Sequence, residues 1–228
     1  MSDIGQIAYL ISIWALPVVL AITIHEAGHA YAAYWLGDDF AHRNGRTSLN
    51  PLVHIDLFGT LLLPALLLIT SAGFIIGYAK PVPVFFKRLK PERIGTALVA
   101  LAGPLANIVL ALLGAVLLYI VPLLPNLVGS WLEPNLKNLI IVNALLAAFN
   151  MLPLPPLDGG RVMMVVLPAR VSERIQVFER LGILLVFGLA LILPPLLSEF
   201  GIRFNPIADW AVGGAGFILS MVYGITGW

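Results

Sequence analysis

The sequence contains no cysteine and few charged residues. The lack of cysteine among 228 residues excludes disulfide bonds, thiol catalysis and cysteine metal ligands. Asp, Glu, Lys and Arg make up 11% of the chain, against about a quarter in an ordinary soluble domain. So few charges cannot cover a soluble surface, and the net charge of +1 gives no reason to expect nucleic acid as a partner.

The apolar content is correspondingly high, at 60% of residues with a mean hydropathy of +0.96. We therefore expect an all-α polytopic membrane protein with five to six transmembrane helices, each needing about 20 apolar residues. We expect one integral-membrane domain over 1–228, with a core at about 5–165 and C-terminal helices at about 181–228. The apolar segments are 4–36, 57–78, 94–121, 136–152, 181–197 and 207–228.

The polar stretch 38–56 predicts a small membrane-associated β-hairpin. Asn44-Gly45 lies at its centre, between short runs that contain Phe40 and Leu49. An Asn-Gly pair between such runs is typical of a type I′ turn. An extended peptide could pair with the free edge of a hairpin over 40–50.

An H-E-x-x-H motif lies inside the first apolar segment, at His25, Glu26 and His29. In a helix the two histidines lie on one face, one turn apart, so both imidazoles can reach one metal ion. Glu26 is placed to act as a general base toward water. The alternative is a structural polar cluster that hydrogen-bonds to neighbouring helices.

A tetrahedral site of this kind needs a third protein ligand. Because cysteine is absent, the candidates near membrane depth are His54, Asp56, Asp158 and Asp209. Asp158 is the best placed, because the three prolines within 153–156 forbid a regular helix just before it. The alternative role for Asp158 is to cap the N-terminus of the helix that follows.

Three motifs resemble those of the site-2 protease family of intramembrane zinc metalloproteases. Residues 25–29 (HEAGH) match H-E-x-x-H, 150–159 (NMLPLPPLDG) match N-x-x-P-x-P-x-L-D-G, and 103–107 (GPLAN) match G-P-x-x-N. The resemblance covers about 20–165. The PDZ and CBS domains of larger members have no counterpart here, so their regulation is not carried over.

The resemblance implies one catalytic zinc ion held by His25, His29 and Asp158, with Glu26 as the base. It also implies that Asn150 binds the substrate backbone or the oxyanion. The alternative for Asn150 is a hydrogen bond between helices.

Asn107 and His54 are further candidates for substrate binding. Asn107 ends the G-P-x-x-N motif, which also suits a kinked site of helix packing. His54 could face the cavity, bind substrate, occupy the zinc in a resting state, or be a loop histidine near the membrane interface.

The charge distribution favours a re-entrant segment at 57–78 over a full span. In the re-entrant arrangement every Lys and Arg except Lys137 and Arg203 lies on one side, whereas a full span moves Arg43 and Arg46 to the other side. The positive-inside rule then puts the N-terminus outside and opens the active site toward the cytoplasm. We expect an integral protein of the bacterial inner membrane.

The sequence therefore predicts an endopeptidase that cuts single-span membrane proteins or remnant signal peptides within the lipid bilayer. Two alternatives from other classes are a zinc transporter or channel and a catalytically inactive membrane scaffold. The sequence leaves the oligomeric state open.

Overall fold

The structure, a computed structural model, describes residues 3–56, 59, 62, 80–168, 170–172 and 179–228. These residues form helices, turns and loops and include no β-strand. The long helices are α1 (Asp3–Trp35), α4 (Glu92–Leu118), α5 (Asn126–Asn150) and α10 (Pro206–Thr226). The shorter elements are α2 (Phe40–Arg43), η1 (Pro51–Val53), η3 (Phe86–Arg88), η4 (Val121–Leu123), α6 (Asp158–Val166), α8 (Glu179–Phe187), η5 (Gly188–Ile192) and α9 (Leu193–Glu199).

Three of the described helices are long and apolar enough to cross a membrane: Ile4–Trp35, Glu92–Leu123 and Pro206–Thr226. Large apolar side chains are exposed along all three, as expected for helices that face lipid. The chain is thus a helical membrane protein. The sequence predicts five to six spans. The described helices account for three of them, and the others stay a prediction.

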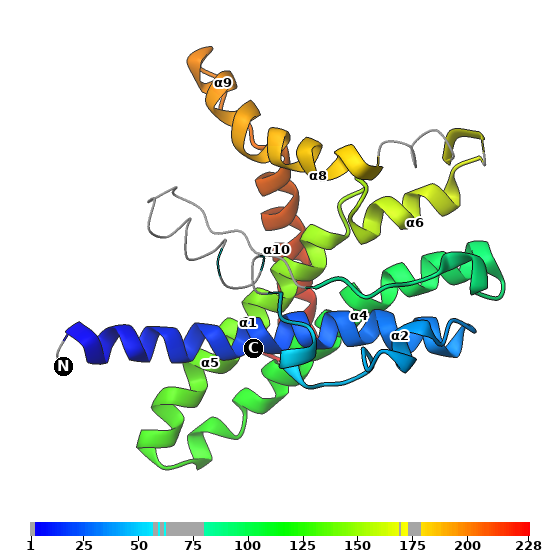
Figure 1. The fold of residues 1–228 in the computed structure, drawn as a ribbon. Helices are drawn as coiled ribbons and strands as arrows, with labels where there is room; N and C mark the ends of the chain where they lie inside the picture. The colour runs from blue at the N-terminus through cyan, green and yellow to red at the C-terminus, as the bar shows by residue number, and fades with distance from the viewer. Residues whose placement is uncertain (1–2, 57–58, 60–61, 63–79, 169, 173–178) are drawn as a thin grey trace.

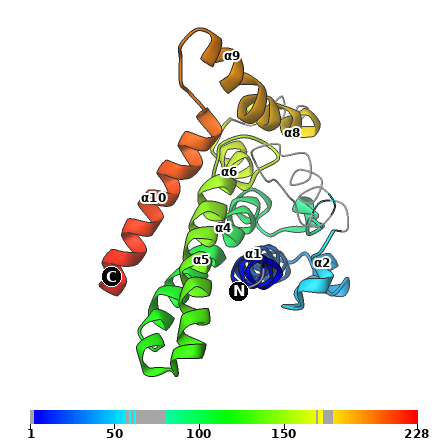
Figure 2. The same cartoon turned by 90° about the vertical axis from the view of Figure 1, so that its left-hand side faces the viewer.

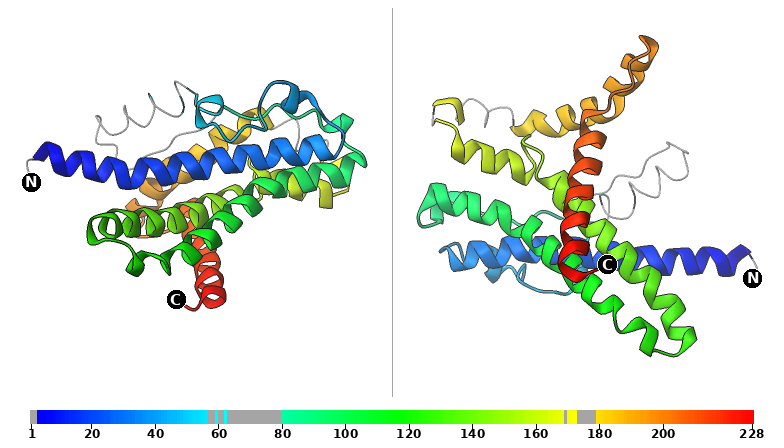
Figure 3. Two further views of the ribbon diagram at one scale, coloured as in Figure 1. Left: turned by 90° about the horizontal axis from the view of Figure 1, so that it is seen from below. Right: turned by 180° about the vertical axis from the view of Figure 1, so that it is seen from behind.

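Small residues bring the long helices together. Ala111 and Ala115 of α4 belong to the same buried cluster as Ala144 and Ala147 of α5, as is common where backbones approach closely in membranes. α1 lies against α4 and α5, and α10 covers the other side of α5 (Figures 1 and 2). Seen from behind, α8 and α9 extend away from this bundle at one end of α10 (Figure 3).

α1 and α5 run in the same sense. Near their N-terminal ends the Tyr9 hydroxyl donates to the Ser130 carbonyl at 3.3 Å, and the Asn138 amide donates to the Ile13 carbonyl at 2.9 Å. Further along, His25 of α1 lies close to Asp158, which follows α5. The re-entrant arrangement requires this shared direction. The segment 57–78 itself lies outside the described residues, except for positions 59 and 62.

The predicted β-hairpin over 40–50 is wrong. Residues 40–43 form the short helix α2, and Asn44-Gly45 ends that helix instead of turning a hairpin. Gly45 has a φ of 71°, the Gly45 N–H donates to the His42 carbonyl at 2.9 Å, and the Arg46 N–H donates to the Ala41 carbonyl at 2.9 Å. These bonds form a Schellman cap. An Asn-Gly pair serves a helix end as well as a hairpin turn, because both need a positive φ.

The segment between α5 and α6 is a series of turns that folds back on α5. The Leu154 N–H donates to the Leu152 carbonyl at 2.7 Å, and the Leu157 N–H donates to the Leu154 carbonyl at 3.0 Å. A Cβ at Gly159 would lie 2.2 Å from the Met151 carbonyl oxygen. Glycine is therefore required here, and the tight return directs Asp158 toward α1.

Candidate metal centre

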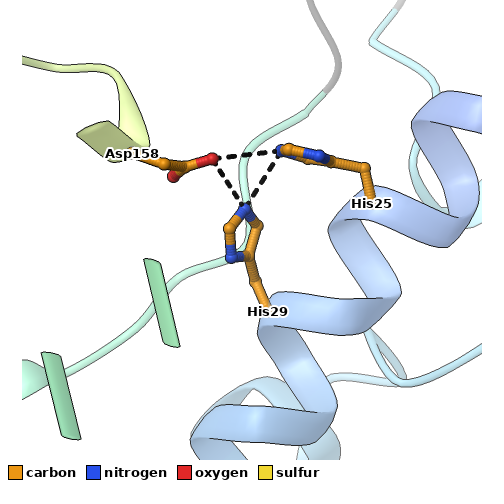
Figure 4. Close-up of side chains that lie close together, drawn as sticks. All are labelled: His25, His29 and Asp158. Carbon is orange, nitrogen blue, oxygen red and sulfur yellow. Dashed lines mark hydrogen bonds and ion pairs between the residues drawn. The ribbon is translucent and has the colours of Figure 1, made fainter. Parts of the chain in front are cut away.

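His25, His29 and Asp158 converge on one point (Figure 4). The two Nε2 atoms are 3.1 Å apart, and each lies 3.3 Å from Asp158 Oδ2. The two histidines come from successive turns of α1, and the aspartate comes from the start of α6 (Figure 4). All three side chains are buried.

Hydrogen bonds on the far side of each ring leave Nε2 free to act as a ligand. His29 Nδ1 donates to the Val99 carbonyl at 2.7 Å, since a carbonyl can only accept. His25 Nδ1 lies 2.6 Å from the Asn107 side-chain oxygen. In neutral imidazoles this puts both Nε2 lone pairs toward Asp158, the arrangement of metal-bound histidines with an outer partner.

These side chains fit a divalent cation. Asp158 Oδ2 is buried and has no hydrogen-bond donor among the described residues, so three acceptor atoms face one another. Such a group is costly without a positive charge at its centre. Gly103 of α4 leaves the space open, because a Cβ there would lie 2.4 Å from His29 Nε2. Two histidines and one carboxylate are a ligand set of catalytic zinc.

Asp158 does not cap α6. It is the first residue of that helix, Leu157 precedes it as the cap residue, and no side-chain cap bond forms there. The carboxylate instead turns toward α1, and its second oxygen lies 4.0 Å from Arg161 Nη1. Among the described residues, neither Asp56 nor Asp209 joins the group of ligand atoms.

Glu26 lies half-buried beside the two histidines. Its Oε2 accepts the backbone N–H of Val82 at 3.1 Å. Val82 stands between Pro81 and Pro83 in an extended segment, which the buried carboxylate of Asp38 fixes by accepting the Phe85 N–H at 2.7 Å. A carboxylate held next to a metal site can act as a general base.

Comparisons with known proteins identify the family of the chain. The family model described as Peptidase family M50 matches residues 126–194. The Bacillus subtilis (strain 168) protein named “Putative zinc metalloprotease YwhC” is 39% identical over 188 residues, which cover 80% of this chain and 81% of that protein. The chain belongs to Peptidase family M50. It is a metalloprotease of the site-2 protease type.

More distant M50 relatives align over much of the chain as well. The Mycolicibacterium smegmatis protein named “Putative zinc metalloprotease Rip2” is 28% identical over 207 residues, 88% of this chain and 72% of that protein. No solved structure gives a significant match.

Asn150, His54 and Asn107, the remaining predicted site residues of this M50 protease, do not join the three ligand candidates. Asn150 is the last residue of α5, and its amide donates to the Leu146 carbonyl at 3.0 Å. His54 is buried, and its Nε2 bonds the Ser48 carbonyl at 2.8 Å, next to Ile22 and Thr23 of α1. The structure does not bring His54 into the group of ligand atoms.

Asn107 is fully buried and contacts His25 directly. Its amide nitrogen donates to the Asn143 side-chain oxygen at 2.7 Å. Asn143 could not be singled out from the sequence, because an isolated asparagine in an apolar segment belongs to no motif. Asn143 and Asn107 are 36 residues apart and lie on different helices, so helical periodicity cannot relate them.

Proposed function

We propose that this M50 protease is an intramembrane zinc endopeptidase. Its substrates are peptide bonds of single-span membrane proteins or remnant signal peptides within the bilayer. The observation that carries this proposal is the convergence of Asp158 with His25 and His29, which lie on an apolar helix of 33 residues. Relatives named “Putative zinc metalloprotease” support zinc as the metal. We propose that the three side chains together hold one ion.

Each side chain has a proposed role in the reaction. A bound zinc ion supplies Lewis-acid chemistry, which polarises a peptide carbonyl and makes water more acidic. Glu26 takes the proton of the attacking water and passes it to the leaving amine. The Asn150 amide steadies the developing oxyanion, a contact worth about 2.7–4 kcal/mol in a measured case. Asn107 holds the His25 ring through its side-chain oxygen, and substrate binding by Asn107 and His54 stays a prediction.

We propose that the site opens toward the cytoplasm of a bacterial cell, with the N-terminus outside. Basic residues gather where α1 ends and α4 begins, at Lys87, Arg88, Lys90 and Arg93, and all four are exposed. This distribution agrees with the positive-inside rule. We also propose five spans, which are the three helices already named together with α5 and the apolar segment at 181–197.

The end of the helix bundle away from the proposed metal site argues against a transporter. There α4, α5 and α10 meet in an apolar cluster that includes Leu118, Leu136 and Val222. Ion transport needs polar groups across both leaflets. An inactive scaffold would have no use for a base beside the metal ligands, whereas Glu26 is held there by Val82.

The test is the substitution Glu26→Gln in the full chain, reconstituted with a model single-span substrate. We expect the variant to keep zinc, because the three ligands are intact, and to lose cleavage by at least a factor of about 100, since general-base catalysis contributes roughly 10²–10⁴-fold. His25→Ala is the companion variant and should lose zinc as well. Cleavage retained by Glu26→Gln would refute the mechanism.

A further inference from the structure

A buried asparagine on α5 lies two hydrogen bonds away from the metal ligand His25. Asn143 is fully buried, and its amide nitrogen donates to the Leu139 carbonyl at 2.8 Å. Its oxygen accepts the Asn107 amide at 2.7 Å, and the Asn107 oxygen lies 2.6 Å from His25 Nδ1. The three side chains thus connect α5 through α4 to α1.

Two backbone carbonyls fix which atom donates and which accepts in this series of hydrogen bonds. The Leu139 carbonyl can only accept, so Asn143 must point its nitrogen toward it and its oxygen toward Asn107. Asn107 uses its nitrogen twice, toward the Ala21 carbonyl at 3.0 Å and toward Asn143. Its oxygen is therefore left for His25, and the His25 Nδ1 atom must carry the hydrogen.

The consequence falls on the opposite nitrogen of His25. With Nδ1 donating, Nε2 keeps its lone pair and faces Asp158. We propose that Asn143 is a positioning residue for the metal site, which acts through Asn107 to hold the ring and tautomer of His25. The inference rests on the proposed metal site.

The same helix contains a natural control. Asn135 is also buried, and its amide donates to the Trp131 carbonyl four residues back at 2.8 Å, as Asn143 does to Leu139. No hydrogen bond connects Asn135 to a histidine among the described residues. Substitution of Asn143 should therefore lower zinc affinity, whereas substitution of Asn135 should not.

The experiment compares Asn143→Ala and Asn143→Thr with Asn135→Ala in the full chain. Both Asn143 variants remove the oxygen that faces Asn107, while the threonine hydroxyl can still bond the carbonyl four residues back and so support the helix. Zinc affinity is measured by competition with a chelator, and the d–d absorption of the cobalt(II) form reports ligand geometry. Neither readout depends on cleavage.

We expect zinc affinity to fall about tenfold in both Asn143 variants, at the low end of the effect of outer partners of metal ligands. The cobalt spectrum should also change. Asn135→Ala should keep zinc affinity within about twofold of the unchanged chain. Asn143→Asp in its protonated form keeps an oxygen facing Asn107 and a hydroxyl that can donate to the Leu139 carbonyl, so this neutral form should retain most of the affinity.

Unchanged zinc affinity and cobalt spectrum in the Asn143 variants would overturn the inference, and so would an equal loss in Asn135→Ala. His25→Ala separates this result from a failure of the metal site itself. If His25→Ala loses zinc while the Asn143 variants do not, the inference alone fails. If His25→Ala binds zinc normally, the proposed site and the inference fail together.

Discussion

The backbone N–H of Val82 donates to the carboxylate of Glu26 at 3.1 Å, across 56 positions of sequence. The bond connects the loop after the segment 57–78 to the residue proposed as the general base. Pro81 and Pro83 flank Val82, so the Val82 N–H is the one donor that these three consecutive residues can offer. The loop therefore presents a single N–H at the position that Glu26 occupies.

Val82→Pro removes this donor and should lower the rate of cleavage about 10-fold or more. Hydrogen bonds to a charged group contribute about 1.5–3 kcal/mol, and a misplaced base loses its alignment with water. The measurement is cleavage of a model membrane substrate under saturating conditions, with zinc content as a check. Val84→Pro, in the same extended segment, should leave the rate nearly unchanged, and equal losses in both variants would contradict the role of the Val82 donor.

A second prediction concerns the effect of the substitution Asp38→Asn on stability. Its carboxylate is completely buried and accepts the N–H groups of Phe40 at 3.2 Å and Phe85 at 2.7 Å, and it lies 3.6 Å from Arg88. Asp38→Asn would point an amide nitrogen at one of these donors. We expect the free energy of unfolding to fall by about 1–3 kcal/mol.

The adjacent residue supplies the control for Asp38. Asp39 forms an ion pair with Arg43, 2.5 Å apart, in which the Arg43 side chain is largely exposed and the Asp39 side chain is partly exposed. Pairs of this kind are worth about 0–1 kcal/mol. Asp39→Asn should therefore be nearly neutral in denaturant unfolding of the purified protein. A larger effect at Asp39 than at Asp38 would refute the assignment.

Gly103 gives a prediction specific to metal binding. A Cβ at this position would lie 2.4 Å from His29 Nε2 and 2.7 Å from His25 Cε1, so Gly103→Ala must displace both rings. We expect zinc affinity to fall at least tenfold with helix content unchanged. Gly114→Ala on the same helix is the control, because the nearest atoms to its Cβ would belong to the Ile140 and Leu139 side chains and the Leu136 carbonyl, none closer than 3.1 Å. Equal zinc affinity in the two variants would contradict the account.

The convergence of His25, His29 and Asp158 could be predicted from sequence because its geometry is mostly local. One helical turn fixes His25 relative to His29, and a run of prolines marks the non-helical approach to Asp158. The hairpin prediction failed because Asn44-Gly45 satisfies the same backbone requirement at the end of α2. The contact between Asn107 and Asn143 could not be found, because it depends on how two apolar helices rotate against each other.

The absence of cysteine makes the proposed orientation directly testable. Single cysteines placed at Lys87 and Ser130 would be the only thiols in the chain, and both positions are exposed. Lys87 lies near the ends of α1 and α4 that surround the metal site, whereas Ser130 lies beside Tyr9 at the other end of α1. In intact bacterial cells a membrane-impermeant maleimide should label Ser130→Cys and should reach Lys87→Cys only after the cells are opened. The reverse pattern would place the site opening outside the cell, and labelling of both positions in intact cells would mean that the two ends of α1 do not lie on opposite sides of the membrane.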